Sequence, residues 1–414
     1  MSPENTRLPK QTADKIPSFQ TPEEAAARDT LAEEAQLPME TDENTPEHPS
    51  TTPLNRPVNM DSSFFGLHWP LGKKEWAIII VIVCILAGTG WILFGRSHSP
   101  QLTIKHMATK PIVSDTVASP LTGLPVPPAQ AKLPITAVMI ENSVPARPQS
   151  GLGQAGVIFE ALTEGGITRF MALYQGNQSG AIGPVRSARP YFIDWLLPFN
   201  AAYAHVGGSQ AALSDISSLN VRDMNQFYNA SYYTRISSRQ APHNVYTSLN
   251  TLSSLEQSKG WNTSTFTSWP RKNPQPSSDP TATTINFYPS GPSMAVNYTY
   301  NAKADDYDRS EGGSAMVGAD SNKQLAPKVV IGMVIPWTNG PLDTSGAYYT
   351  DYADVGSGTV YIFQNGTVTT GTWEKPTQNS QLQFIDSNGQ PIPLNAGQTW
   401  ITVIGNSSEM NYSH

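Results

Sequence analysis

Residues 160–169 read Glu-Ala-Leu-Thr-Glu-Gly-Gly-Ile-Thr-Arg and join two apolar runs, 157–164 and 167–174. A Gly-Gly pair between two such runs is typical of a β-hairpin, because the tightest hairpin turns need positive φ at both central residues. A two-residue turn places Leu162 opposite Arg169 and Glu160 opposite Met171. The predicted inner face of this hairpin is then mostly apolar and consists of Phe159, Ala161, Thr163, Thr168, Phe170 and Ala172.

The other face of the predicted hairpin carries Glu160, Glu164 and Arg169. Arg169 lies diagonally between the two glutamates, within reach of a long side chain. One interpretation is a cluster of ion pairs on a solvated sheet face, which is common and weak. The other is a carboxylate pair in a cleft, with Arg169 setting the charge state of the glutamates. Because the predicted register places the three side chains on one face, we expect them to face the same cleft.

A second group of charged residues follows in the stretch Gly183-Pro-Val-Arg186-Ser-Ala-Arg189-Pro190. The stretch predicts a turn into a helix over 188–197, with Ser187 as the N-cap and Pro190 in the first turn. Arginines at a helix N-terminus oppose the helix dipole, so an anion is expected beside Arg186 and Arg189. That anion is either Glu160 or Glu164, or a phosphate or carboxylate of a ligand, with His243 and Asn244 completing the site.

His205 ends a predicted strand over 201–206, and Gly207-Gly208-Ser209 leads into a predicted helix over 210–219. Strand and helix alternate here as in α/β folds, which place ligands at the carboxyl ends of their strands. Ser209 is interpreted as a helix cap, with a nucleophile near His205 as the alternative. The stretch Ala241-Pro-His243-Asn244 precedes another predicted helix, which ends near Leu255.

The remaining sequence predicts two folded parts of different class. Residues 119–256 are expected to form an α/β domain, and 257–280 a low-complexity linker rich in Ser, Thr, Pro and Asn. Residues 281–408 are expected to form a β-rich domain, because short apolar runs alternate there with turn pairs such as Asn365-Gly366. The strands expected around the core include 135–141, 284–288, 294–300, 329–335, 359–363, 367–374, 382–385 and 399–404.

The N-terminal part predicts a membrane anchor. Residues 1–75 are acidic and poor in large apolar residues, with 13 acids and 7 bases, and are expected to be a disordered cytoplasmic tail. Trp76–Phe94 is a run of 19 residues without a charge, enough for one transmembrane helix over 76–95. Lys73, Lys74 and Arg96 flank it and slightly favour a cytoplasmic N-terminus. A polar linker over 96–118 then leads to extracytoplasmic domains.

Charge and motif content narrow the function classes. The net charge is −7, of which −6 falls in residues 1–75, and no segment is strongly basic. Nucleic acid is therefore not expected as a partner. No His-x-x-x-His spacing, phosphate loop or Gly-x-Ser-x-Gly elbow occurs. We therefore expect no metal and no cofactor; the alternative is a zinc site formed by His205, His243 and a glutamate.

Several of these motifs together resemble the YerB-like lipoprotein family, whose domain has been called domain of unknown function 3048. They are Pro120-Leu-Thr-Gly123, Glu160 with 164–169, 183–189, His205 with 207–209, 241–244, Gly371-Thr-Trp-Glu-Lys375 and Gly397-Gln-Thr-Trp400. The resemblance runs from about Pro120 to the C-terminus. It implies an extracytoplasmic bacterial protein with an α/β domain followed by a β domain, and no settled activity. Cys84 follows Val83 and has no lipobox, so attachment is expected through the transmembrane helix.

Two functions remain open at this point. The first is a membrane-anchored cell-envelope protein that binds an anionic or saccharide envelope ligand through a Glu/Arg/His cleft. Its candidate residues are Glu160, Glu164, Arg169, Arg186, Arg189, His205, His243 and Asn244. The alternative is an envelope-polymer hydrolase or lyase that uses Glu160 and Glu164, since glycosidic cleavage needs two carboxyl groups with different pKa values. An adjacent arginine lowers both pKa values, which favours binding over catalysis.

Overall fold

The computed structural model describes residues 115–176, 180–342 and 348–414, which belong to one compact unit. The predicted cytoplasmic tail, the predicted transmembrane helix and nearly all of the first linker lie outside the described residues. Within the described part, no helix combines the length and apolar character that a membrane crossing requires.

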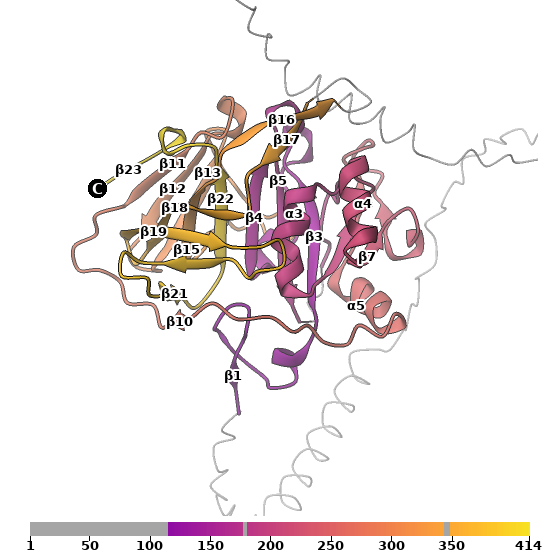
Figure 1. The fold of residues 1–414 in the computed structure, drawn as a ribbon, viewed down its shortest axis with the longest axis horizontal. Helices are drawn as coiled ribbons and strands as arrows, with labels where there is room; N and C mark the ends of the chain where they lie inside the picture. Colours follow the sequence, from indigo (N-terminus) through magenta and orange to yellow (C-terminus); the bar gives the residue numbers. More distant parts are fainter. Residues whose placement is uncertain (1–114, 177–179, 343–347) are drawn as a thin grey trace, which may run out of the picture. The chain divides into compact units, whose positions relative to one another are not determined.

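A ten-stranded sheet runs through the unit (Figure 1). Its strand order is β20-β19-β18-β15-β22-β4-β5-β3-β6-β7. The central strands are apolar and buried on both faces, as the strands of covered sheets are. Their bounds are β3 Ile135–Glu141, β4 Val157–Leu162, β5 Thr168–Gln175, β6 Ala202–His205, β7 Arg222–Asn225, β15 Val329–Val334, β18 Gly356–Gln364, β19 Thr367–Lys375, β20 Gln383–Ile385 and β22 Thr399–Ile404.

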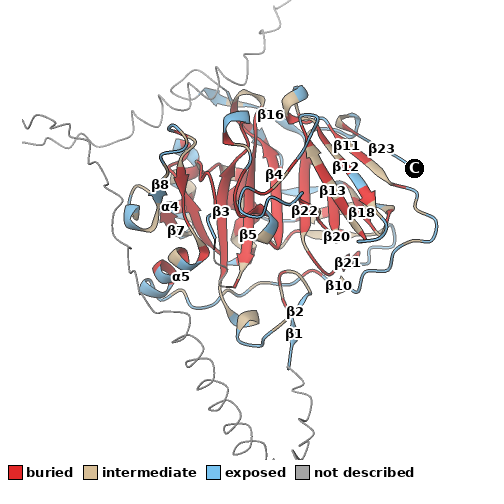
Figure 2. Cartoon of the chain, turned by 180° about the vertical axis from the view of Figure 1, so that it is seen from behind, coloured by how far each residue is buried: buried red, intermediate tan, exposed pale blue. Residues whose placement is uncertain are grey.

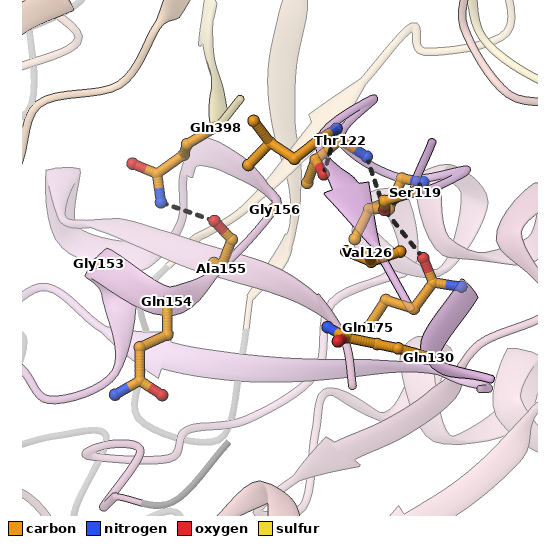
Figure 3. A pocket seen from close by; sticks show the side chains of 12 residues that line it. Ser119, Thr122, Val126, Gln130, Gly153, Gln154, Ala155, Gly156, Gln175 and Gln398 are labelled. Atoms are coloured by element: carbon orange, nitrogen blue, oxygen red, sulfur yellow. Dashed lines mark hydrogen bonds between the residues drawn. The ribbon is translucent and has the colours of Figure 1, made fainter. Parts of the chain in front are cut away.

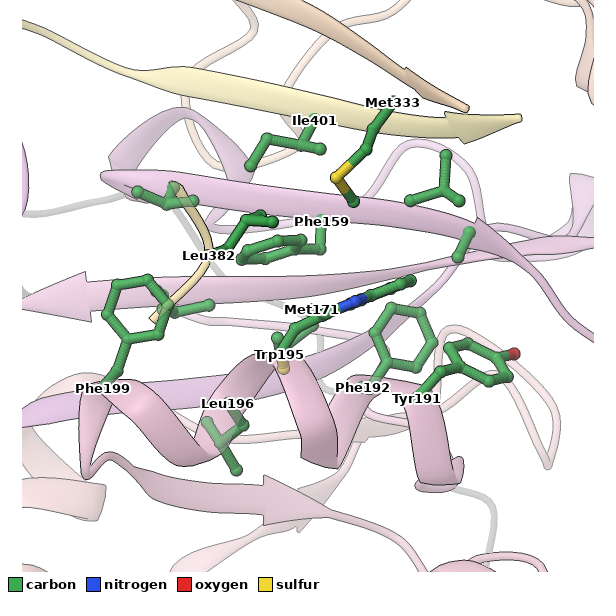
Figure 4. Close-up of a cluster of buried hydrophobic side chains, with 14 of the residues drawn as sticks. Phe159, Met171, Tyr191, Phe192, Trp195, Leu196, Phe199, Met333, Leu382 and Ile401 are labelled. Atoms are coloured by element: carbon green, nitrogen blue, oxygen red, sulfur yellow. The ribbon is translucent and has the colours of Figure 1, made fainter. Parts of the chain in front are cut away.

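The two faces of this sheet are covered by different elements. One face, here called the helix face, carries Phe159 and Met171 and packs against the helix α3, Pro190–Leu196 (Figure 4). Trp195 of that helix stacks on Phe159 with ring centroids 5.4 Å apart. The opposite face, called the sandwich face, carries Phe170 and Trp400 and packs against a second sheet. Because both faces are covered, most of the middle of the large sheet is buried (red in Figure 2).

The second sheet has the strand order β14-β13-β12-β11-β23. It contributes Phe287, Tyr298 and Tyr307 to the core of the sandwich face. Fully buried residues alternate with less buried ones along β12 and β13, as in strands with one face toward solvent. The bounds are β11 Thr284–Phe287, β12 Val296–Asn301, β13 Asp306–Glu311, β14 Ser314–Ala315 and β23 Met410–Ser413.

Shorter two-stranded sheets complete the described part. The hairpin of β16 and β17 lies beside the Glu164–Gly166 turn. The bounds are β1 Val117–Ala118 with β2 Pro125–Val126, β8 Thr234–Arg235 with β9 Val245–Tyr246, β10 Arg271–Lys272 with β21 Leu394–Asn395, and β16 Trp337–Leu342 with β17 Tyr348–Tyr352.

The described chain is mostly β, and its α-helices are α3 Pro190–Leu196, α4 Gln210–Ser218 and α5 Leu249–Ser258. An alternation of strand and helix occurs around β6, α4 and β7, where the strands are parallel. Ser209 caps α4, because its Oγ accepts a hydrogen bond of 3.2 Å from the Ala212 N–H, as predicted. Ser187 was predicted wrongly as the cap of α3, because Arg189 takes that position in an extended conformation.

The two halves predicted as separate domains both contribute to the large sheet. Strand β22 of the second half lies between β15 and β4, and Thr399 pairs with Val157. The segment predicted as a linker is ordered between them. Trp269 is buried and its Nε1 donates a hydrogen bond of 2.6 Å to the carbonyl oxygen of Leu382.

The register predicted for the β4–β5 hairpin is wrong by one residue. Thr163 and Ile167 close a three-residue turn, Glu164–Gly166, with a hydrogen bond of 2.7 Å from the Thr163 N–H to the Ile167 carbonyl. Gly165 and Gly166 have φ of 64° and 75°, so the glycines still permit the turn. The additional residue makes Arg169 face Ala161 and Glu160 face Phe170. A one-residue slip moves a side chain to the opposite face, so Glu160 and Arg169 do not share a cleft.

Candidate functional site

Glu160 lies on the sandwich face, in the middle of the core. Its side chain is completely buried, as is that of Arg309 of β13, and the two form an ion pair of 3.1 Å. The Trp400 indole N–H donates a hydrogen bond of 2.9 Å to Glu160 Oε2, and the Thr168 hydroxyl donates one of 3.1 Å to Oε1. The Arg309 guanidinium also stacks on Trp400, with its carbon 4.3 Å from the ring centroid. Each polar atom of Glu160 therefore has a partner inside the protein.

The Glu160–Arg309 pair continues into a larger buried network. Glu311 accepts hydrogen bonds from Arg309, Arg147 and Asn142, at 3.3, 2.9 and 2.6 Å. Burial raises the pKa of Glu311. Burial lowers the pKa of the Arg309 guanidinium, but Glu160, Tyr298 and Glu311 outweigh that effect and hold the pKa above its usual value. The network joins the large sheet to the second sheet. We interpret it as part of the core.

Glu164 and Arg169 meet on the helix face, together with Arg189. The guanidinium of Arg189 binds Glu164 in a bidentate manner, through Nε to Oε1 and through Nη2 to Oε2, the latter at 2.6 Å. Arg169 Nη2 lies 3.4 Å from Glu164 Oε2, and its Nη1 donates to the Ser187 carbonyl oxygen at 3.2 Å. All three charged side chains are buried. Of the alternatives open for the anion beside Arg189, the structure shows internal pairing with Glu164.

The hairpin of β16 and β17 covers this cluster from outside. The ring of Tyr349 lies against the Arg189 guanidinium, with 5.2 Å from the guanidinium carbon to the ring centroid. The Thr350 hydroxyl donates a hydrogen bond of 3.2 Å to the carbonyl oxygen of Thr163. The Glu164 cluster is thus held on one side by the sheet and on the other by this hairpin.

Glu141, at the end of β3, organises a second cluster on the same face. It pairs across the strands with Arg169 and accepts a hydrogen bond of 2.6 Å from the Ser143 hydroxyl. The Nδ1 atom of His243 lies 2.9 and 3.0 Å from its two carboxylate oxygens, and Arg186 Nε lies 3.8 Å from Oε2. Burial raises the pKa of Glu141, but Arg186 and the bonds from His243 and Ser143 outweigh it and hold the pKa below its usual value.

His243 differs from its buried neighbours in its exposure. Its side chain is 14% exposed, against 4% for Glu141 and 2% for Arg186. The structure gives Nε2 no hydrogen bond to the residues that it describes. Because the carboxylate fixes Nδ1, the imidazole is oriented and its other nitrogen remains available for a ligand.

His205 lies at the end of β6, as predicted, but in a closed environment. Its Nδ1 is 2.7 Å from the carbonyl oxygen of Gly207, and its Nε2 is 2.9 Å from Asp223 Oδ1. Burial raises the pKa of Asp223. The hydrogen bond with His205 and the charge of His205 outweigh this effect and hold the pKa below its usual value. Both ring nitrogens thus have partners, and we interpret His205 as an anchor for the Gly207-Gly208 turn. Within the described ranges, no three His, Cys, Asp or Glu side chains are arranged to hold a metal ion.

Asn244 has a partner other than Glu141. Its Oδ1 accepts a hydrogen bond of 2.9 Å from Arg235, which is exposed. The next arginine, Arg239, donates to the carbonyl oxygens of Ala146 and Pro148, the latter at 2.7 Å. The surface around His243 therefore carries two arginines whose partners are uncharged.

The structure divides the eight predicted site residues into three groups. Five of them gather on the helix face, where β3 ends and β5 begins. They are Glu164, Arg169, Arg186, Arg189 and His243. Glu160 lies on the sandwich face and His205 and Asn244 have partners of their own. Glu141, Asp223, Arg239 and Arg309 were not predicted. For Glu141 the available signal was a charged residue directly after the apolar run 137–140.

Comparison with known proteins agrees with this fold. The sequence profile described as "Protein of unknown function (DUF3048) N-terminal domain" matches residues 121–262, and that of the DUF3048 C-terminal domain matches 284–401. The chain is 29% identical over 302 residues to the "Putative lipoprotein YerB" of Bacillus subtilis (strain 168), covering 71% of this chain and 89% of YerB. The crystal structure of YerB from Bacillus subtilis superposes with a TM-score of 0.65 and 27% identity, covering 72% of this chain and all of that chain. The chain belongs to the DUF3048 family, of which both the N-terminal and the C-terminal domain are present.

Proposed function

We propose that the protein is an extracytoplasmic, membrane-anchored protein of the cell envelope that binds an anionic envelope ligand at the surface around His243. The likeness to YerB, whose name describes a lipoprotein, supports the location. The apolar run Trp76–Phe94 supports attachment by a transmembrane helix, with the N-terminus in the cytoplasm.

The observation that carries the ligand site is the combination of exposure and orientation at His243. His243 is one of the predicted ionisable site residues. Its side chain is partly exposed, and its Nδ1 is held by the buried carboxylate of Glu141. Arg186 offsets the charge of Glu141, so that Arg235 and Arg239 leave this surface positive. Their charge and their N–H groups suit a phosphate or carboxylate of an envelope polymer.

The alternative, a hydrolase or lyase that uses Glu160 and Glu164, receives less support. A general acid must reach the bond that it protonates and must hold its proton near neutral pH. Glu160 is completely buried beside Arg309, and Glu164 is buried between Arg169 and Arg189. Their carboxylates lie on opposite sides of the sheet and do not flank a common substrate position.

The test is binding of glycerol phosphate oligomers to the full chain in lipid nanodiscs. We expect His243→Gln and Arg239→Gln each to weaken binding by roughly tenfold, the size of one charge-assisted hydrogen bond. The affinity of the unchanged protein is expected to fall as the salt concentration rises, because the contacts are exposed.

Arg222 provides a matched control for Arg239. Arg222 also donates to two backbone carbonyl oxygens, those of Asn200 and Thr263. It is the first residue of β7, so it lies at the opposite ends of the strands from the site at the end of β3. Arg222→Gln is expected to leave binding unchanged. If Arg222→Gln and Arg239→Gln weaken binding equally, or if neither variant nor His243→Gln does so, the proposed site is wrong.

A further inference from the structure

A pocket of about 640 Å³ lies at the ends of the central strands that are far from His243. Figure 3 shows this pocket from close by. Its walls include Gly156 just before β4, Gln175 at the end of β5 and Gln398 just before β22. These are the opposite ends of the strands that carry the Glu164 cluster. The volume falls within the range of about 300–1,000 Å³ that is usual for ligand pockets.

Four glutamines from distant parts of the chain meet in the lining of this pocket. They are Gln130, Gln154, Gln175 and Gln398, and the rest of the lining has no charged side chain. All four glutamine side chains are partly exposed. They therefore line the pocket with amides that a ligand can reach from outside.

Two of the glutamines hold the walls of the pocket in place. Gln175 accepts a hydrogen bond of 3.1 Å from Ser119 and donates to the carbonyl oxygens of Ala131 and Leu133. Gln398 donates to the carbonyl oxygens of Leu152 and Ala155, at 2.9 and 2.7 Å. Figure 3 shows the bonds from Gln398 to Ala155 and from Ser119 to Gln175 on two sides of the pocket. The pocket is thus preformed by bonds between segments.

The other two glutamines have hydrogen-bonding capacity left for a ligand. The carboxamide of Gln130 forms no hydrogen bond with the described residues. It lies against Gly176, because a Cβ added at that glycine would be only 2.7 Å from Gln130 Nε2. Gln154 Nε2 donates to Asp320 Oδ2 at 3.0 Å, which leaves its carbonyl oxygen. A carboxamide offers two donors and an acceptor with two lone pairs, so these two can both donate to and accept from a ligand.

We propose that this pocket binds an uncharged saccharide that carries acetamido groups. Sugar hydroxyl and acetamido groups both donate and accept hydrogen bonds, which matches carboxamides and requires no charge in the lining. Leu121, Leu124 and Val126 provide apolar surface for the methyl and C–H groups of such a ligand. This site is separate from the proposed anion site and does not depend on it.

The experiment uses tri-N-acetylchitotriose as the probe and the full chain in lipid nanodiscs, with saturation-transfer NMR and calorimetry as readouts. We expect saturation transfer to the acetamido methyl groups. Gln130→Ala is expected to weaken binding between about twofold and tenfold, because it removes one or two neutral hydrogen bonds. Val126→Trp is expected to abolish binding by filling the pocket.

Gln257→Ala is the matched control, because Gln257 is an exposed glutamine of α5 outside the pocket. It should bind the probe as the unchanged protein does, and so should Arg239→Gln, which tests only the anion site. Gln130→Ala keeps the test valid if Val126→Trp does not fold. Absence of binding, or equal binding by Gln130→Ala and the control, overturns the proposal. Equal binding of trialanine at the same pocket overturns the assignment to a saccharide.

Discussion

Glu160 and Arg309 lie 149 positions apart in the chain, and their completely buried side chains form an ion pair of 3.1 Å across the two sheets. A buried charge is costly to leave without its partner, because neither water nor another ion replaces the lost interaction. The pair therefore ties the folding of the N-terminal half to that of the C-terminal half. It also explains why Glu160, which resembles a catalytic residue by sequence, is a structural one.

Removing Arg309 tests this interpretation. We expect Arg309→Met to lower the free energy of unfolding by about 3–5 kcal/mol, because Glu160 and Glu311 would remain buried without their shared cation. The double variant Glu160→Gln/Arg309→Met should recover part of that loss. Urea denaturation of the full chain, followed by tryptophan fluorescence, measures both.

Lys328→Met serves as the comparison for Arg309→Met. Lys328 is 31% exposed and lies 3.8 Å from Asp306, so its pair is expected to contribute less than about 1 kcal/mol. A loss for Arg309→Met no larger than that for Lys328→Met would contradict a structural role of the Glu160–Arg309 pair.

Glu256 should make stability fall as the pH rises through the range from about 4.5 to 7. Its burial raises its pKa to about 7, although Thr136 donates a hydrogen bond of 2.7 Å to it and Arg222 lowers the pKa. In that range the folded state binds a proton that the unfolded state has released, so unfolding becomes easier with rising pH. The change approaches about 3 kcal/mol across the range.

Glu256→Gln isolates this contribution, since glutamine resembles the protonated acid. We expect the variant and the unchanged protein to unfold alike below about pH 4.5, and the variant to be more stable at pH 8. The measurement is the unfolding free energy in a series of buffers. A constant difference at every pH would show that Glu256 does not retain its proton on folding.

Gly166 is expected to set the register of the β4–β5 hairpin through its backbone. Its φ is 75°, and a Cβ would meet nothing closer than Ser290 Cβ at 3.6 Å, so space is available. Gly166→Ala should therefore destabilise the fold by about 1–2 kcal/mol through the left-handed backbone alone. Gly291, with φ of −70° and no atom within 4 Å of an added Cβ, is the matched control. Gly291→Ala should be neutral or slightly stabilising, and equal losses at both positions would contradict this explanation.

The apolar run Trp76–Phe94 is expected to anchor the chain in the membrane. Val83→Arg places a charge at its centre, which costs about 3 kcal/mol for insertion and should move protein from the membrane fraction to the soluble fraction. Thr51→Arg, in the polar tail, should leave fractionation unchanged. Full retention of Val83→Arg in the membrane would indicate another means of attachment.

Local patterns predicted several elements within the large sheet. The strands Ile135–Glu141 and Thr399–Ile404 have the bounds expected from their apolar runs, and Ser209 caps its helix as expected. These features depend on neighbours within a few residues, such as the alternation of apolar side chains or the first N–H groups of a helix. They could therefore be predicted from the sequence.

The site itself depended on details that local patterns do not contain. One residue more in the Glu164–Gly166 turn moved Arg169 away from Glu160, because alternate residues of a strand face opposite sides. The partners of the charged residues are distant in sequence, such as His243 for Glu141 and Arg309 for Glu160.

The sequence by itself determined the apolar runs that form central strands, which side chains can be charged, and that Trp76–Phe94 is apolar enough for a membrane anchor. The tertiary structure decided which charges meet, which are buried and which face water. Strand pairing between β22 and β4 brings the two halves of the chain into one sheet, and that pairing fixes both faces at once. Contacts across such a sheet follow from register and packing, which no short stretch of sequence specifies.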